Sequence, residues 1–192
     1  MKNYIKNSIL LLFISFLALA FTTVNPEKKD VDVKSSTIEW LGTKVTGKHN
    51  GTINLKSGHF LFKDNKLAGG HFIVDMNTIV CLDLKGEYKS KLEKHLSSDD
   101  FFGVATFPEA TFKITKIGLV TKTKYKVTGD LTIKGKTLEN SFNLEFVDNK
   151  ATGTIVIDRS KYDVKYGSGS FFDNLGDKTI ADDFELKVSL VF

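Results

Sequence analysis

Cysteine is almost absent from this chain of 192 residues, which contains a single one, Cys81. One cysteine excludes an internal disulfide, so the hydrophobic core alone must hold the fold together. We interpret Cys81 as a small buried apolar residue. The alternative is a reactive thiol in an exported protein.

An excess of charge of one sign is also missing. The chain carries 27 Lys and Arg against 23 Asp and Glu, a net charge of +4, which falls to +2 once Lys2 and Lys6 of the first 20 residues are set aside. The lysines are spread along the sequence rather than gathered in one run. This pattern argues against a nucleic-acid partner.

Sequence motifs of catalysis and metal binding are missing as well. The four histidines have neither H-x-H nor H-x3-H spacing and no cysteine companions: His49, His59, His71 and His95. No G-x-S-x-G occurs, and the glycine-rich stretch at 166–172 lacks the Lys-Ser/Thr of a phosphate loop. The acid pairs at 99–100 and 182–183 are interpreted as solvated turn residues. We expect no metal and no enzyme; a hydrolase or metal protein that uses these acids and histidines is a rival hypothesis.

Long hydrophobic runs are limited to one, Ile9–Phe21, which is 13 residues long and shorter than the ~20 needed to cross a bilayer as a helix. It follows a basic start and ends near the small residues at 18–20. This arrangement predicts a signal peptide over residues 1–20 and a periplasmic or secreted mature chain. The alternative is an uncleaved membrane anchor.

The rest of the chain alternates apolar and polar residues with a period of two. At 125–134, for example, Tyr125, Val127, Leu131 and Ile133 share one side, and polar residues share the other. Such alternation is typical of antiparallel strands with one dry face. After a flexible lead-in at 21–35, one domain over 36–192 is expected. Its predicted strands are 36–47, 51–63, 66–76, 109–119, 123–134, 137–147, 150–158 and 183–192.

Residues 86–98 are the exception, because their apolar residues Tyr88, Leu92 and Leu96 follow helical spacing. Eight amphipathic strands joined by short turns avoid open edges when they close into a barrel. The predicted fold is therefore all-β, an eight-stranded antiparallel β-barrel with one short α-helix capping an end. A barrel of this size either fills with side chains or holds one small ligand. A two-sheet sandwich is the structural alternative.

Five stretches carry a resemblance to a known family. They are GKHNGTI (47–53), DMNTI (75–79), KLEKHLSSDDFFGVATFPEATF (91–112), VTGDLTIKGKT (127–137) and IDRSKYDVKYGSG (157–169). In these, the chain resembles the YceI-like proteins of bacterial periplasms. Gly103 stands where that family often has Asp, and Asp163 stands where it commonly has Gly.

The resemblance implies a lipocalin-like barrel that encloses a polyisoprenoid or similar lipid, and it leaves a homodimer open. We expect the apolar faces of the strands, with Phe101 and Phe102 beneath the helix, to line the cavity. The expected ligand-binding residues are Phe60, Phe62, Phe72, Val74, Phe101, Phe102, Phe112, Ile114, Tyr125, Val127, Leu131, Ile133, Phe142, Leu144, Phe146, Ile155, Phe184, Leu186 and Val188. Plain core packing is the alternative for each of them. The expected headgroup residues at the rim are His49, Arg159 and Tyr162.

The expected function is that of an exported protein that carries or stores a long apolar lipid such as a polyisoprenoid, an isoprenoid quinone or a fatty-acid-like chain. No cofactor is expected beyond a bound isoprenoid lipid or quinone. Transient contact with a membrane surface is compatible with this role. The alternative is a periplasmic stress-response or interaction module whose barrel is filled and binds no ligand.

Overall fold

A computed structural model describes residues 25–192, most of which form β-strands. The predicted signal peptide, 1–20, therefore lies outside the described residues. The strands are β1 (Glu27–Asp30), β2 (Asp32–Lys44), β3 (Gly47–Lys63), β4 (Lys66–Cys81), β5 (Glu109–Leu119), β6 (Lys124–Ile133), β7 (Lys136–Val147), β8 (Lys150–Asp158) and β9 (Ile180–Val191). The helices are α1 (Gly86–Ser97) and two short 3-10 turns, η1 (Arg159–Tyr162) and η2 (Gly176–Lys178).

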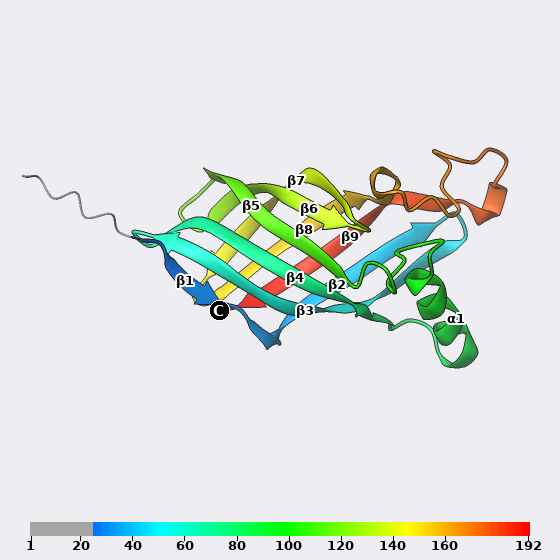
Figure 1. Cartoon of the computed structure of the whole chain (residues 1–192), viewed down its shortest axis with the longest axis horizontal. Helices are drawn as coiled ribbons and strands as arrows, with labels where there is room; N and C mark the ends of the chain where they lie inside the picture. The colour runs from blue at the N-terminus through cyan, green and yellow to red at the C-terminus, as the bar shows by residue number, and fades with distance from the viewer. Residues whose placement is uncertain (1–24) are drawn as a thin grey trace, which may run out of the picture.

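The strands form one antiparallel sheet that closes on itself (Figure 1). Neighbours follow the order β1-β3-β2-β9-β8-β7-β6-β5-β4, and β3 also pairs with β4. The eight strands β2 to β9 thus form a closed ring, and the short β1 continues the line of β2 along β3. The predicted eight-stranded barrel is confirmed.

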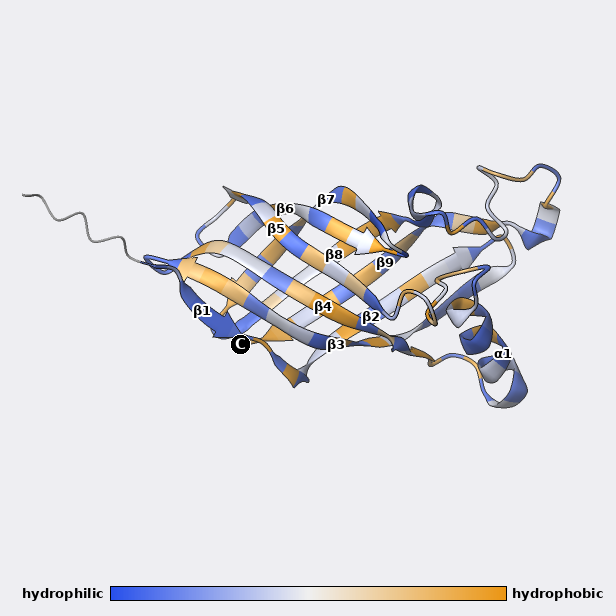
Figure 2. Ribbon diagram, viewed as in Figure 1, coloured by the Kyte–Doolittle hydropathy of each residue, from blue (hydrophilic) through white to orange (hydrophobic). Residues whose placement is uncertain are grey.

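Hydrophobic and polar residues alternate along the strands (Figure 2). The apolar residues form the buried core cluster, so the barrel has a dry interior and a wet exterior. Tight turns with positive φ connect successive strands, such as Asp64-Asn65 between β3 and β4, with φ of 51° and 60°. The β3–β4 register has an irregularity between Leu55 and Ser57, where the strand shifts by one residue.

The expected flexible lead-in at 21–35 is wrong for its second half. β1 pairs with β3 from Glu27 opposite Phe62 to Asp30 opposite His59. Val31 is buried, and the ammonium of Lys29 lies 5.3 Å from the centre of the Phe62 ring. The segment looks polar because its side chains are mostly on the outer face, while its backbone completes the sheet.

One end of the barrel, which we call the aromatic end, is filled by rings. Phe60 is completely buried, and its ring centroid lies 5.2 Å from that of Phe146 and 5.1 Å from that of Phe192. Phe62 stacks on Phe192 at 5.6 Å. Edge-to-face and stacked contacts of this kind are favourable beyond the area they bury. The barrel is therefore solid at this end.

The opposite end, which we call the covered end, carries α1 and the segment 163–179 (Figure 1). Leu96 of α1 packs against the core, whereas Tyr88 is 75% exposed, so the predicted apolar stripe of the helix is only partly buried. Among residues 25–192, no helix combines the length and the hydropathy that crossing a membrane requires.

Cys81, the last residue of β4, is fully buried, as expected. Burial raises the pKa of its thiol above the ordinary value. Its Sγ lies 3.3 Å from Oδ1 of Asp83, to which the thiol donates. A buried thiol with a raised pKa is a poor nucleophile at neutral pH.

Candidate functional site: an apolar cavity in the barrel

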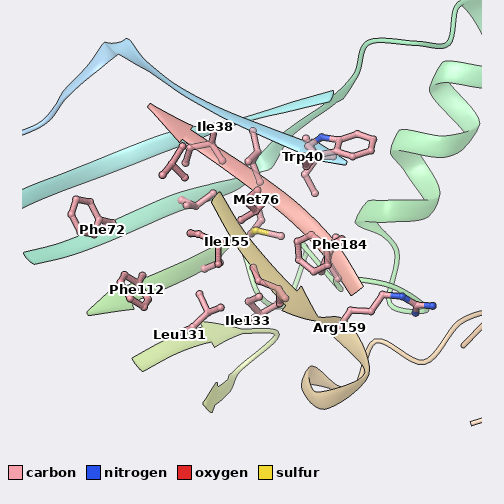
Figure 3. A pocket seen from close by; sticks show the side chains of 18 of the residues that line it. Ile38, Trp40, Phe72, Met76, Phe112, Leu131, Ile133, Ile155, Arg159 and Phe184 are labelled. Atoms are coloured by element: carbon pink, nitrogen blue, oxygen red, sulfur yellow. The ribbon is translucent and has the colours of Figure 1, made fainter. Parts of the chain in front are cut away.

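The barrel encloses a cavity of about 180 Å³ between the aromatic end and the covered end. Its wall is made of aliphatic and aromatic side chains from every strand of the closed ring. Figure 3 shows most of the labelled side chains around one interior space, with Phe72 and Phe112 far from α1 and the guanidinium of Arg159 extending away from this space. Apart from the indole of Trp40, whose Nε1 donates to the carbonyl of Thr52, the polar side chains that residues 25–192 bring to the wall are those of Thr111 and Arg159.

Most of the residues predicted to face a ligand lie on this wall. They are Phe72, Val74, Phe101, Phe102, Phe112, Leu131, Ile133, Phe142, Leu144, Ile155, Phe184, Leu186 and Val188. They come from strands that are far apart in sequence and are brought together by the closure of the sheet. Their place on the wall follows from the geometry, and their contact with a ligand stays a prediction.

Six predicted residues do not line the cavity: Phe60, Phe62, Ile114, Tyr125, Val127 and Phe146. All six point inward, as expected, but they lie in or beside the aromatic end, where they pack on one another. The Tyr125 and Phe146 rings, for example, meet edge to face at 5.6 Å. These residues are core packing, which was the stated alternative for each of them.

Other wall residues were not singled out from the sequence. They are Ile38, Trp40, Gly42, Ile53, Leu55, Met76, Ile79, Leu96, Ala110, Thr111, Ile157, Ile180, Ala181 and Leu190. The period-two pattern could have identified several of them. Ile38, Trp40 and Gly42 lie on the same face of β2, and Ile157 lies on the same face of β8 as the predicted residue Ile155. The small residues gave no such signal.

Glycines on the strands make room for the rings of the wall. A Cβ on Gly51 would lie 2.6 Å from the Trp40 ring, and one on Gly129 would lie 2.6 Å from Cζ of Phe112. The rings of Trp40 and Phe112 therefore occupy the space that side chains at these two positions would need. Gly42 differs, because an added Cβ would meet no atom within 4 Å in the described part of the chain.

The two bulky residues after α1 close the covered end from within. Phe101 is buried and meets Phe102 edge to face at 4.9 Å, and Phe102 lies 6.3 Å from Phe184 of β9. The imidazole of His95 lies between Phe101, at 5.6 Å, and Tyr166, at 4.3 Å. The prediction that both phenylalanines turn inward beneath the helix agrees with this arrangement.

Arg159 is 2% exposed and serves the fold rather than an exposed rim. Its guanidinium donates to four carbonyl oxygens, those of Val164, Tyr166, Ile180 and Ala181, at 2.7 to 3.0 Å. Burial lowers the pKa of Arg159, and the nearby Asp182 opposes this shift. Because four of the five N–H donors are already used, Arg159 is not free for a headgroup.

The other two expected rim residues are Tyr162 and His49. Tyr162 is 3% exposed, and burial raises its pKa. His49 lies outside the cavity wall with Nδ1 2.8 Å from Oδ2 of Asp83. Burial alone would raise the pKa of Asp83, but hydrogen bonds from Asn50, His49 and Cys81 lower it to about 2. A headgroup contact by these three residues stays a prediction, which the burial of Arg159 and Tyr162 and the Asp83 contact of His49 do not favour.

A second hollow, which we call the polar groove, lies at the covered end and has a volume of about 540 Å³. It is lined by Asp99, Asp100, Lys134, Asp163, Lys165, Tyr166, Gly167, Phe172, Leu175 and Lys178. Lys134 donates to the carbonyls of Asp99 and Phe101, both at 2.8 Å. Phe101 also belongs to the cavity wall, so the groove and the cavity meet at this residue.

Within residues 25–192, no group of three or more His, Cys, Asp or Glu side chains is placed to hold a metal ion. His59 and His71 face each other across β3 and β4, with ring centroids 6.3 Å apart. Desolvation, followed by the charge of Lys28, lowers the pKa of His59. The apolar cavity is therefore the candidate functional site.

Comparisons with known proteins agree with this geometry. A family model described as the YceI-like domain matches residues 23–192. A UPF0312 protein of Vibrio parahaemolyticus is 34% identical over 97 residues, 50% of this chain and 49% of that protein. A UPF0312 protein of Staphylococcus aureus is 40% identical over 85 residues, 38% of this chain and 47% of that protein. The chain spans about half the length of the curated relatives it matches.

Solved structures share the fold. Burkholderia cenocepacia BcnA has a TM-score of 0.65 at 25% identity, covering 84% of this chain and 99% of that one. A polyisoprenoid binding domain from Saccharophagus degradans has a TM-score of 0.55 at 12% identity, covering 84% and 95%. The Campylobacter jejuni YceI protein has a TM-score of 0.52 at 18% identity, covering 98% and 96%. Because the family model spans the whole barrel, the chain belongs to the YceI-like family.

Proposed function

We propose that this protein binds the chain of a long apolar lipid, such as a polyisoprenoid or an isoprenoid quinone, inside its barrel. The single observation that carries the proposal is the wall of the cavity, which is apolar over nearly its whole area and closed by rings at both ends. A wall of this kind gives no site for an ion or a sugar, but it suits a hydrocarbon chain. The polyisoprenoid binding domain of Saccharophagus degradans, which has the same fold, supports this class of ligand.

The expected binding is reversible. Moving a hydrocarbon chain out of water gains about 0.8 kcal/mol per CH₂. A membrane solvates the same chain equally well, so the preference for the protein over the bilayer is small. A carrier or reservoir in an exported, periplasmic location fits this balance better than a tight sink does. The proposed role is binding rather than catalysis.

The polar end of the lipid would remain outside the cavity, because the cavity wall offers it few hydrogen-bonding groups beyond Thr111 and the already bonded Arg159. We assign it to the polar groove, because Lys134 of the groove bonds to the carbonyl of the wall residue Phe101. Its three lysines and three aspartates give it no net charge. This balance favours a neutral or zwitterionic headgroup over a multiply charged one.

The size of the cavity supports a second candidate function, that of an interaction module that binds no ligand. At about 180 Å³, the cavity is smaller than the roughly 300–1,000 Å³ of most small-molecule sites. Side chains of the wall must therefore move when a lipid binds. In the alternative, they stay in place and the outer surface does the work.

Two measurements separate these functions. Mass spectrometry of organic extracts from the natively produced protein should find a co-purified isoprenoid lipid or quinone. Trp40, the sole tryptophan, lies on the cavity wall, so a ubiquinone with a two-isoprene tail should quench its fluorescence in delipidated protein. Absence of lipid from the extract together with unquenched Trp40 would reject lipid binding and favour the interaction module.

A further inference from the structure

The barrel wall is not hydrogen-bonded all the way round. β6 pairs with β7 along its whole length, from Lys124 to Ile133. β7 and β8, by contrast, share four residue pairs, from Leu144 opposite Gly153 to Val147 opposite Lys150. In the part of the chain that the structure describes, residues 136–143 of β7 have no partner on β8, and residues 154–158 of β8 have none on β7. We call this unpaired stretch the β7–β8 seam.

The seam borders the cavity. Continuing the register of the paired residues would place Phe142 opposite Ile155 and Asn140 opposite Ile157. Phe142, Ile155 and Ile157 all belong to the cavity wall. The wall is thus closed here by side chains and not by a ladder of backbone hydrogen bonds. Side chains change rotamer far more readily than a paired sheet opens.

A polar residue occupies the inner face of β7 at this place. Asn140 lies between the inward residues Leu138 and Phe142 on the period-two pattern, and its Nδ2 donates to the carbonyl of Val156 at 3.3 Å. Its Oδ1 is buried without a hydrogen-bond partner among the described residues. A buried acceptor without a partner costs free energy, so a purely structural role would be filled better by an apolar side chain.

The other routes into the cavity are obstructed. Packed rings fill the aromatic end, and Phe101, Phe102 and the Arg159-bound segment close the covered end. β4 and β5 also pair only in part, from His71 opposite Lys113 to Asp75 opposite Glu109. Residues 66–70 of β4 and 114–119 of β5 lie towards the aromatic end, where the interior is solid. Residues 76–81 of β4 run past the start of β5 towards α1, and there the backbone N–H of Met76 donates to the carbonyl of Pro108.

We propose that the β7–β8 seam is the lateral portal through which the lipid passes between the cavity and the outside, with the Asn140–Val156 hydrogen bond as its latch. The proposal rests on the lipid-binding function above. The seam runs towards the covered end, where the β6–β7 turn carries Lys134 of the polar groove. A lipid that enters sideways can therefore keep its headgroup in the groove while its chain moves into the bore.

Kinetics test the portal. The Asn140–Val156 hydrogen bond is present in both the free and the lipid-bound protein and must break only while the lipid passes. Its loss therefore speeds association and dissociation by the same factor and leaves Kd unchanged. Stopped-flow quenching of Trp40 by the two-isoprene ubiquinone measures both rates. In Asn140→Ala, both should rise at least fivefold, with Kd within twofold of the native value. Asn143→Ala, on the outer face of the same strand, is the matched control and should behave as the native protein.

A covalent lock gives the opposite change. Ser141 and Val156 are exposed and would face each other if the register continued, so a disulfide between Ser141→Cys and Val156→Cys closes the seam. It should slow both rates at least tenfold, and reduction should restore them. A control disulfide between Thr152→Cys and Ser189→Cys joins two strands that already pair and should leave the rates unchanged.

The outcomes are distinguishable. Normal quenching of Trp40 with unchanged rates in both Asn140→Ala and the locked protein would overturn the portal and leave lipid binding intact. A parallel change of Kd and dissociation rate in Asn140→Ala, with an unchanged association rate, would make Asn140 a wall residue and would also overturn the portal. Failure of any quenching in the native protein would overturn both the function and the portal.

Discussion

The ring of Phe112 occupies the space that a side chain on Gly129 would need. A Cβ added to Gly129 would lie 2.6 Å from Cζ of Phe112 and would also clash with the backbone oxygen of Lys113. The first contact can relax by rotation of the ring, which would then enter the bore. The second cannot relax without displacing the sheet, because the oxygen belongs to the β5 backbone.

Gly129→Ala should therefore destabilise the protein by about 1–3 kcal/mol, the usual cost of overpacking a filled interior. Urea unfolding followed by circular dichroism measures this loss. Gly118→Ala is the matched control, since its Cβ would come no closer than 3.8 Å to the carbonyl of Lys126. Equal stability of the two variants would contradict the close approach of Phe112.

Replacement of Arg159 should loosen the covered end. Arg159→Met removes a guanidinium that donates to four carbonyl oxygens and leaves those acceptors without partners, at a cost of about 3–5 kcal/mol. Hydrogen exchange should rise first in residues 163–181. Arg159→Lys should rescue little, because a single ammonium cannot reach four divergent acceptors. Protection that stays native in both variants would contradict this role.

Filling the open space at Gly42 should reduce ligand capacity without harming the fold. An added Cβ there would meet no atom of residues 25–192 within 4 Å, and Gly42 itself lines the cavity. Gly42→Leu should keep native stability in thermal melts while binding less ubiquinone per protein. Thr43→Leu places the same side chain on the outer face of β2 and should bind normally. Full binding by the Gly42 variant would show that this part of the cavity is not used.

Stability should fall in acid through Asp83. Its pKa is about 2 in the folded protein and about 3.9 when unfolded, so the stabilisation is complete above pH ~5 and is lost as the pH falls towards 2. The carboxylate is partly exposed to solvent, which limits the contribution to about 1 kcal/mol. Asp83→Asn should lower stability at pH 7 and not at pH 2. An identical pH dependence for both proteins in urea titrations would refute this assignment.

The sequence predicted which side of each strand faces inward, because parity is a local property of the chain. Phe142 and Ile155 were placed correctly for this reason. Parity does not tell how deep along the barrel a residue lies, because depth depends on the register between strands. Phe60 and Phe146 were therefore taken for cavity residues although they fill the aromatic end.

The roles of residues that depend on contacts with distant segments could not be predicted from the sequence. Arg159 was predicted to bind a headgroup. The fold brings the carbonyls of Ile180 and Ala181 to its guanidinium, and the sequence around Arg159 does not indicate these contacts. The strand at Glu27–Asp30 was missed because its residues are all charged and show no apolar alternation. Its backbone pairing with β3 is what makes it a strand. The β7–β8 seam is likewise a property of two strands and leaves no trace in either one.

The rings of Phe60, Phe146 and Phe192 turn the bore into a blind tube. A hydrocarbon that reaches them can go no further, so each additional isoprene unit stays near the surface, where it gains little. The affinity for isoprenoid lipids should therefore rise with the length of the tail and stop rising once the end of the tail contacts these rings.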